Sequence, residues 1–304
     1  MFYPRIHNSY ISGGHVKNMN EESIIDGMVE LIRKAETQLP EDVIKSLKQA
    51  YELEKGVAKT QIAAILENID LARKSKRPMC QDTGIQTFFV EVGIDFPNIK
   101  MLKKVISDGV KKATSEIPLR PNTMDPLTGE NHKDNTGEHI PYITWDLTKG
   151  SDVKITAFPK GGGSENMSRL GMLKPGVGIK GVKDFVVEEI IKAAGQPCPP
   201  TVVGVGIGGG ADLSLKLGKK ALLRPVGIRN KDKKIASIEE ELIKRINASG
   251  IGPMGLGGKT TVLDVHVEIA HRHPASLPVG IAVQCWADRR AYMVIYRDGS
   301  WKVI

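Results

Sequence analysis

Long apolar runs, aromatic residues and cysteines are all scarce in this chain of 304 residues. No segment approaches the roughly 20 consecutive apolar residues that span a bilayer. The first residues, MFYPRIHNSYISGGH, lack the charged-then-apolar plan of a signal peptide. These absences predict a cytoplasmic protein with no membrane partner. The composition, with 40% apolar and 26% charged residues, is that of a globular chain with a sizeable core.

Aromatic residues make up 5% of the chain, which leaves few platforms on which nucleic-acid bases could stack. The net charge of +8 does permit an anionic partner. The lysines of the chain, however, occur in scattered groups at 103–104, 111–112 and 231–234, a pattern typical of solvated helix faces. We therefore expect no nucleic-acid partner, and a small anionic substrate accounts for the positive charge equally well.

The three cysteines are Cys80, Cys198 and Cys285, an odd number that argues against a disulfide framework. No two of them form a Cys-x-x-Cys pair, which excludes zinc ribbons and ferredoxin-type runs. Each lies in a polar or glycine-rich segment: MCQDTG, QPCPP and QCWADRR. They are therefore either inert buried thiols or ligands in one site assembled from three distant loops.

Hydrophobic periodicity predicts an α+β (mixed α/β) fold, in which a helical N-terminal region precedes mixed β-sheets flanked by helices. A tail over 1–20 precedes one domain over 21–290, and residues 291–304 form a β-hairpin of the same domain that turns at Asp298 and Gly299. Three helices are expected within 21–75, and others at 98–115, 183–194, after Asp212 and at 237–246. Strands are expected at 87–92, 143–147, 153–158, 201–205, 262–269 and 279–283. The polar stretch 117–141 is too long for a simple connector, which predicts a binding loop.

Two glycine-rich motifs raise the alternative of nucleotide binding. Gly204, Gly206 and Gly209 have dinucleotide-fingerprint spacing, but no acidic residue ends the next strand, where the sequence is ALLRPVGIRN. A tight strand-to-helix turn explains the same glycines. The segment GGKTT at 257–261 is similar to a phosphate loop, but Pro253 stands where that loop needs its first glycine.

Several segments together resemble class I fumarate hydratase and its relative L(+)-tartrate dehydratase. They are CQDTG from Cys80, PKGGGSEN from Pro159, CPPTVVGVGIGG from Cys198, GIGPMGLGGKTT from Gly250 and AHRHP from Ala270. The resemblance extends in order over roughly residues 20 to 290. It implies an enzyme of the hydro-lyase class.

The resemblance also implies a 4Fe-4S cluster held by Cys80, Cys198 and Cys285. Three thiolates on four irons leave one iron open, which can act as a Lewis acid on the substrate. The same resemblance makes Asp82 a catalytic and substrate-binding group. Alternatively, Asp82 is a turn residue before Gly84.

Other site residues follow from the same motifs. Arg120 is expected to clamp a substrate carboxylate, and Gln81 and the backbone at Gly163 are expected to contact the substrate.

His273 is expected to donate a hydrogen bond or pass a proton. Alternatively, His271 and His273 could bind zinc together with Cys285. Lys160 is assigned only a steering charge.

Family members with a single chain continue into a second domain, so the resemblance makes this chain an alpha subunit that needs a separate beta subunit. A dimer of alpha-beta pairs is expected by analogy. The segment KGGGSEN favours the reversible hydration of fumarate to (S)-malate, and L(+)-tartrate dehydration is the alternative. A non-catalytic subunit that only holds a cluster is a more distant possibility.

Overall fold

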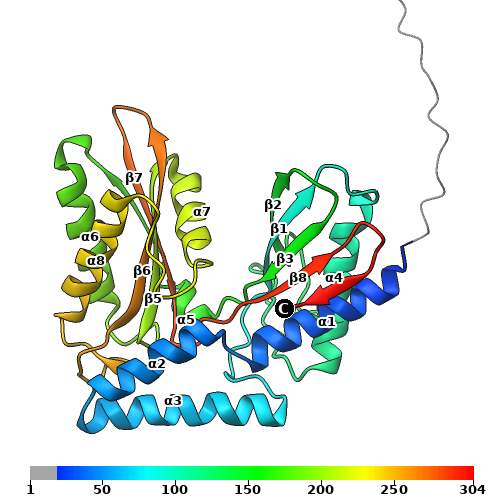
Figure 1. The fold of residues 1–304 in the computed structure, drawn as a ribbon, viewed down its shortest axis with the longest axis horizontal. Coiled ribbons are helices and arrows are strands. Elements are labelled where there is room, and N and C mark those ends of the chain that lie inside the picture. The colour runs from blue at the N-terminus through cyan, green and yellow to red at the C-terminus, as the bar shows by residue number, and fades with distance from the viewer. Residues whose placement is uncertain (1–18) are drawn as a thin grey trace, which may run out of the picture.

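The computed structural model describes residues 19–304, so nearly all of the tail predicted over 1–20 lies outside the described residues. Three helices follow, as predicted: α1 (Glu21–Thr37), α2 (Glu41–Leu53) and α3 (Gly56–Ser75). Asn20 caps α1 by accepting a hydrogen bond from the Ser23 N–H. Helices α2 and α3 lie side by side along the base of the molecule (Figure 1).

The first sheet has the strand order β2-β1-β3-β8-β9. Its strands are β1 (Thr87–Gly93), β2 (Tyr142–Thr148), β3 (Val153–Ala157), β8 (Ala291–Ile295) and β9 (Trp301–Val303). Strands β1 and β2 are parallel and the other neighbours are antiparallel. Helices α1 and α4 (Leu102–Glu116) pack together, and their apolar residues form one core with this sheet. The predicted C-terminal hairpin is confirmed by the pairing of β8 with β9.

The second sheet has the order β4-β7-β5-β6. Its strands are β4 (Arg169–Leu173), β5 (Thr201–Gly209), β6 (Val262–Arg272) and β7 (Leu277–Gln284). Helices α6 (Gly178–Ala193) and α8 (Lys233–Asn247) cover one face and α7 (Ala211–Ala221) covers the other (Figure 1). With both faces covered, β7 is buried along its whole length and shows no polar alternation. The predicted α+β class, with mixed sheets flanked by helices, is confirmed. Strand β4 was not predicted, because it is short and only partly buried.

The glycines of the fingerprint-like motif allow α7 to pack closely on β5. A Cβ on Gly204 would lie 2.0 Å from the Gly218 carbonyl oxygen, and one on Gly206 would lie 2.0 Å from that of Ser214. Any side chain at either position would therefore push the helix off the strand. Close helix–strand contact accounts for the glycine spacing without a nucleotide.

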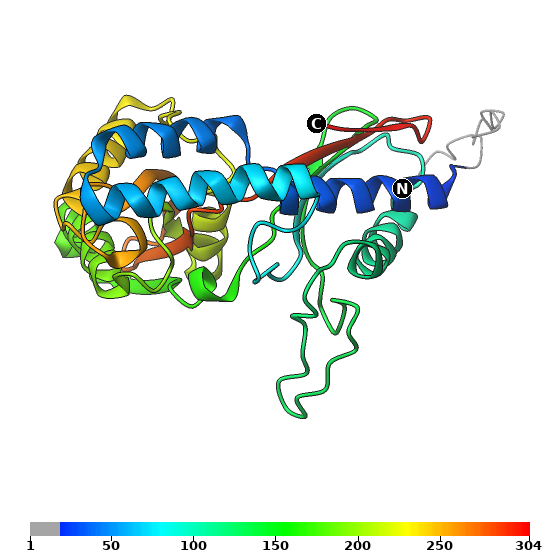
Figure 2. The same cartoon turned by 90° about the horizontal axis from the view of Figure 1, so that it is seen from below.

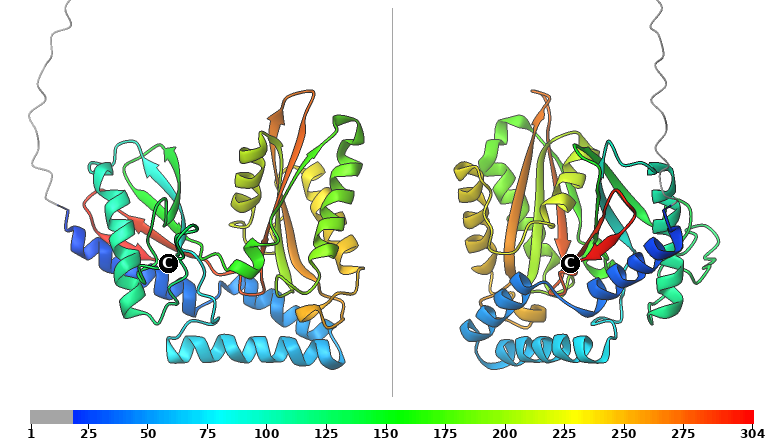
Figure 3. Two further views of the ribbon diagram at one scale, coloured as in Figure 1. Left: turned by 180° about the vertical axis from the view of Figure 1, so that it is seen from behind. Right: turned by 45° about the vertical axis from the view of Figure 1, so that its right-hand side comes forward.

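A groove lies between the first sheet and α7 of the second, and Figure 3 shows the two sheets side by side from two further directions. Phe89 and Thr144 of the first sheet and Leu217 of α7 line a cavity of about 230 Å³ in this groove. The Lys220 Nζ of α7 lies 3.5 Å from Asp146 Oδ2 of β2 across it.

Residues 117–141 contain no helix or strand longer than an isolated bridge, as predicted, and project from the body (Figure 2). Within residues 19–304 no helix combines the length and apolar character needed to cross a bilayer.

Candidate active site

Two of the three cysteines lie at the same edge of the second sheet. Cys285 follows β7 directly, and Cys198 precedes β5. Because the strands are antiparallel, with Gln284 opposite Val202, the end of β7 meets the start of β5. The Trp286 N–H donates to the Cys198 carbonyl oxygen at 3.2 Å, which ties the two loops together.

Cys80 joins them from the segment between α3 and β1. Burial raises the pKa of Cys285 to about 11, and the negative charge of Cys80 contributes to this shift. Burial also raises the pKa of Cys198, and the charge of Cys80 is the next largest cause. Cys80 therefore lies within electrostatic range of both other cysteines. All three are free, partly exposed thiols brought together from three distant loops.

The donor set fits an iron-sulfur cluster better than a single metal ion. Among residues 19–304 no group of three or more His, Cys, Asp and Glu residues is arranged to hold one ion. A cluster of several irons is wider than an ion and takes thiolates as its protein ligands. The raised pKa values of Cys198 and Cys285 mean that binding would have to displace their protons.

Asp82 is oriented by backbone N–H groups from two loops. Its Oδ1 accepts from the Gly84 N–H at 2.8 Å and its Oδ2 accepts from the Gly162 N–H at 2.7 Å. Ile85 and Lys160 exchange two backbone hydrogen bonds of 3.0 Å, which hold these loops side by side. Gly84 permits the approach, because its φ is +72° and a Cβ would lie 2.7 Å from the Lys160 carbonyl carbon. The carboxylate is fixed in position while the residue stays partly exposed.

Asp82 also borders a cavity of about 650 Å³. Arg120 lines the same cavity, so the structure brings the predicted clamp and the predicted catalytic carboxylate to one place. The Arg120 N–H donates to Thr83 Oγ1 at 3.0 Å, and the Asn122 amide donates to Gly84 O at 3.1 Å, which attach the 117–141 loop beside Asp82. The remaining lining residues are Gly84, Ile85, Thr87, Asn122, Ile140, Tyr142, Lys160, Gly162, Glu165, Asn166 and Lys219.

Two lysines give this cavity further positive charge. The Lys160 Nζ lies 3.3 Å from Glu165 Oε2 and donates to Ser164 Oγ at 2.7 Å. Burial lowers the pKa of Lys160 to about 8, against the opposing effect of Glu165. The Lys219 Nζ of α7 lies 2.5 Å from Glu165 Oε1. With Arg120, the cavity therefore has three cationic side chains against two carboxylates, which suits an anionic ligand.

The other predicted contacts are placed differently. Gln81 and Gly163 are exposed, and each is next in sequence to a residue that lines the cavity, Asp82 and Gly162 respectively. His273 is also exposed but lies beyond the end of β6, where Gly209 pairs with Arg272. That end is separated from the cysteines by the length of the sheet, roughly 25 Å for eight residues of strand. Within this chain His273 reaches neither the cavity nor the cysteines, and the same separation keeps the two histidines from sharing a zinc ion with Cys285.

The backbone groups of the segment similar to a phosphate loop are already occupied. The Glu54 carboxylate, almost fully buried, accepts the Lys259 N–H at 2.8 and 3.0 Å and the Thr260 N–H at 2.6 Å. These donors hold the loop against the α2–α3 junction. They are not free to hold a phosphate.

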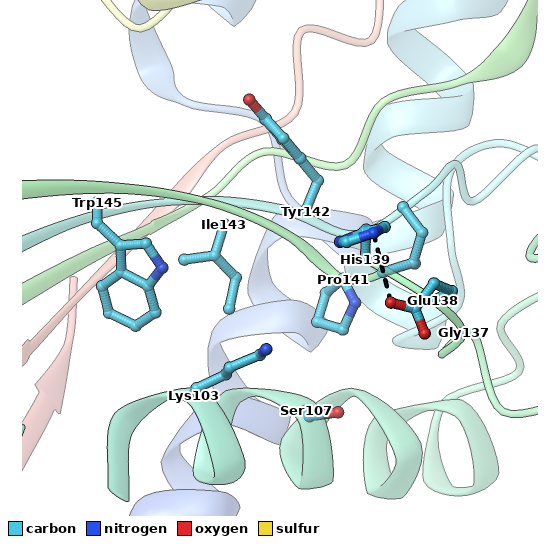
Figure 4. Close-up of a pocket in the computed structure, with 10 residues that line it drawn as sticks. Lys103, Ser107, Gly137, Glu138, His139, Pro141, Tyr142, Ile143 and Trp145 are labelled. Carbon is cyan, nitrogen blue, oxygen red and sulfur yellow. Dashed lines mark ion pairs between the residues drawn. The ribbon is translucent and has the colours of Figure 1, made fainter. Parts of the chain in front are cut away.

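A second groove, of about 500 Å³, lies between α4 and the start of β2 (Figure 4). Lys103 and Ser107 lie on α4, Ile143 and Trp145 face that helix, and Tyr142 points away from it. The Nε2 of His139 lies 3.3 Å from Glu138 Oε1. None of the cysteines, Asp82 or Arg120 lines it. The chemical groups of the chain therefore converge on the larger cavity instead.

The motifs behind this arrangement agree with a comparison against known families. The model of the fumarate hydratase (Fumerase) family matches residues 25–294. The chain belongs to the fumarate hydratase (Fumerase) family.

Curated relatives of this Fumerase-family chain are named as alpha subunits. The putative L(+)-tartrate dehydratase subunit alpha of Methanocaldococcus jannaschii is 53% identical over 91% of this chain and 99% of its own length. The L(+)-tartrate dehydratase subunit alpha of Escherichia coli O157:H7 is 36% identical over 92% of this chain and 94% of its own length. The chain is thus similar to whole subunits, and the name alpha implies that such proteins have a beta partner.

Sequence reasoning about this family member missed Lys219 and Glu165 and underrated Lys160. Glu165 lies within the motif PKGGGSEN, but nothing in the sequence shows that Lys219, 54 residues later, would pair with it. The available signal was that Glu165 closely follows the glycine run 161–163 and that Lys219 directly follows Gly218.

Proposed function

We propose that this chain is the alpha subunit of an iron-sulfur hydro-lyase acting on a small hydroxydicarboxylate. The convergence of three free thiols from distant loops beside Asp82 and a cationic cavity carries this proposal. Cys80, Cys198 and Cys285 would hold a 4Fe-4S cluster. When bound, such a cluster supplies an iron without a protein ligand, which polarises substrate oxygens as a Lewis acid.

The side chains around the cavity divide the remaining work. Arg120 would hold one substrate carboxylate through a pair of hydrogen bonds, and Lys160 and Lys219 would offset the charge of the dianion. Asp82, held by the N–H groups of Gly84 and Gly162, would accept or donate the proton that moves when water is removed or added.

The relatives' names favour L(+)-tartrate as the substrate over fumarate, the substrate that the motif KGGGSEN favoured. Tartrate has one more hydroxyl group than malate, and a site built to bind that hydroxyl would reject malate strongly. We therefore propose L(+)-tartrate dehydration as the first activity to measure. Reversible hydration of fumarate to (S)-malate is the second.

A separate beta subunit would complete the site. The cavity beside Asp82 is open, and Arg120, Gln81 and Gly163 are exposed, which leaves room for basic groups from a partner. We propose a cytoplasmic dimer of alpha-beta pairs, and we expect the alpha chain alone to be weakly active or inactive.

Anaerobic reconstitution tests the proposal directly. Iron, sulfide and zinc are measured on the purified chain, and dehydration of L(+)-tartrate and of (S)-malate is then assayed with and without the beta subunit. About four irons and four sulfides per chain, with activity that requires both subunits, would support it. Zinc in place of iron would reject the cluster, and a full cluster without activity on any dicarboxylate would favour a non-catalytic subunit.

A further inference from the structure

A buried ion pair lies behind the cysteines. Glu36, near the end of α1, is completely inaccessible, and Arg289, four residues after Cys285, is 1% exposed. Their Oε2 and Nη1 atoms are 2.7 Å apart. Burying two charges costs several kcal/mol per ion, and apolar side chains of similar volume are often at least as stabilising. The pair therefore needs a reason beyond stability.

Backbone and side-chain contacts connect this pair to two of the cysteine loops. The Met79 N–H, directly before Cys80, donates to the Glu36 carbonyl oxygen at 3.0 Å. The Gln86 amide donates to Glu36 Oε1 at 3.1 Å, so that Glu36 also holds the other end of the Cys80 loop. Arg289 belongs to the segment that begins at Cys285.

The guanidinium of Arg289 faces the site. Its Nη2 lies 3.6 Å from the point where a Cβ on Gly161 would sit, and Asp82 Oδ2 lies 3.1 Å from the same point. Burial by itself would lower the pKa of Arg289, but the charges of Glu36, Cys285 and Cys80 together raise it. The Arg289 Nε–H is buried without a hydrogen-bond partner among the described residues. It is thus a donor for which a group absent from the chain itself could supply the acceptor.

We propose that the Glu36–Arg289 pair sets the electrostatic potential at the cysteine site, with Arg289 offsetting the negative charge of the cluster-bound thiolates and Glu36 limiting that effect. Both are positioning residues, because they act through the cysteines and Asp82. The inference rests on the proposed function, since it assumes a cluster on the three cysteines. A buried charge acts strongly there because the surrounding dielectric is low.

The two halves of the pair should act in opposite directions. In Glu36→Gln the charge of Arg289 is no longer compensated, which favours the more negative, reduced cluster and moves its midpoint potential upward. In Arg289→Gln the compensating cation is lost and the midpoint moves downward. The double variant should fall between the two single ones. A purely structural role predicts no such difference in sign.

The experiment is a dithionite titration of the reconstituted chain, followed by electron paramagnetic resonance, with iron and sulfide counted in each variant. Arg224 and Glu239 provide the matched control, because fully buried Glu239 lies 2.5 Å from partly buried Arg224 and no cysteine charge contributes to the pKa of Arg224. Arg224→Gln and Glu239→Gln should lose stability but leave the midpoint unchanged. Arg289→Lys keeps the positive charge and should therefore keep the midpoint potential close to that of the unaltered chain.

Opposite shifts in Glu36→Gln and Arg289→Gln would support the proposal. Shifts of the same sign, or none beyond those of the control pair, in chains with full iron content would reject it while leaving the proposed function intact. If Arg289→Gln fails to fold, an unchanged midpoint in Glu36→Gln still rejects it. Absence of iron from the unaltered chain would instead reject the proposed function, and the role of the pair with it.

Discussion

Replacing Asp82 with asparagine separates a catalytic carboxylate from a turn residue. The substitution keeps the size of the side chain but turns one accepting oxygen into a donor. One of the two short bonds, from Gly84 or from Gly162, must then be lost, because an amide N–H cannot accept from a backbone N–H.

The structural cost of this change is modest. Losing a hydrogen bond to a charged group costs about 1.5–3 kcal/mol, and domains are typically stable by about 5–15 kcal/mol. Most of the Asp82→Asn protein should therefore stay folded. Loss of a general acid or base, by contrast, lowers turnover about 10²- to 10⁴-fold, which corresponds to about 2.7–5.4 kcal/mol in the barrier. Unfolding alone cannot produce that loss.

Asp125 provides a matched control in the same chain. Its Oδ1 accepts the N–H groups of Leu127 and Thr128, each at 2.8 Å, in the exposed part of the 117–141 loop. Asp125→Asn removes the same charge outside the cavity, and the remaining oxygen of the side chain can keep both backbone contacts. Turnover of the reconstituted alpha-beta complex, its iron content and its urea unfolding are measured for both variants.

We expect Asp82→Asn to keep its iron and lose at least about 100-fold in turnover, while Asp125→Asn keeps both. Equal activity in the two variants would show that Asp82 only shapes a turn. Loss of iron in Asp82→Asn alone would assign the residue to the cysteine site and not to proton transfer.

Three further predictions concern the cavity and the packing beneath it. Arg120→Lys should raise the KM for the dicarboxylate about tenfold at nearly constant kcat, because a paired contact worth about 1.5 kcal/mol is lost; a fall in kcat alone would contradict the clamp. Burial lowers the pKa of Lys160 to about 8, so its charge disappears as the pH rises through that value. KM should therefore increase above pH 8, and Lys160→Met should flatten this rise. Identical pH profiles of KM in the two proteins would exclude Lys160 from binding. Gly206→Ala should lower the free energy of unfolding in urea by about 1–3 kcal/mol. Gly176→Ala, with open space around its Cβ, should change it by less than about 0.5 kcal/mol. Equal effects would refute the close packing of α7.

Local patterns predicted most of the elements. The three N-terminal helices have strong helical periodicity, and the hairpin over 291–304 has a clear turn at Asp298–Gly299. Strand β4 was missed because an edge strand of five residues has too little burial to give a pattern. Its existence depends on pairing with β7, which is distant in sequence.

The amino-acid sequence by itself determined the class of chemistry. It supplied three cysteines without a close pair, the segment CQDTG and the glycine-rich motifs, all of which are properties of residue type and spacing. Tertiary structure alone decided which of these groups meet. It brought Arg120, Lys160 and Lys219 around Asp82 and left His273 at the far end of the second sheet. It also placed Arg289 against Glu36, a contact across 253 positions. Such contacts depend on how sheets pair and where helices pack, and the chain between two residues carries no local signal of either.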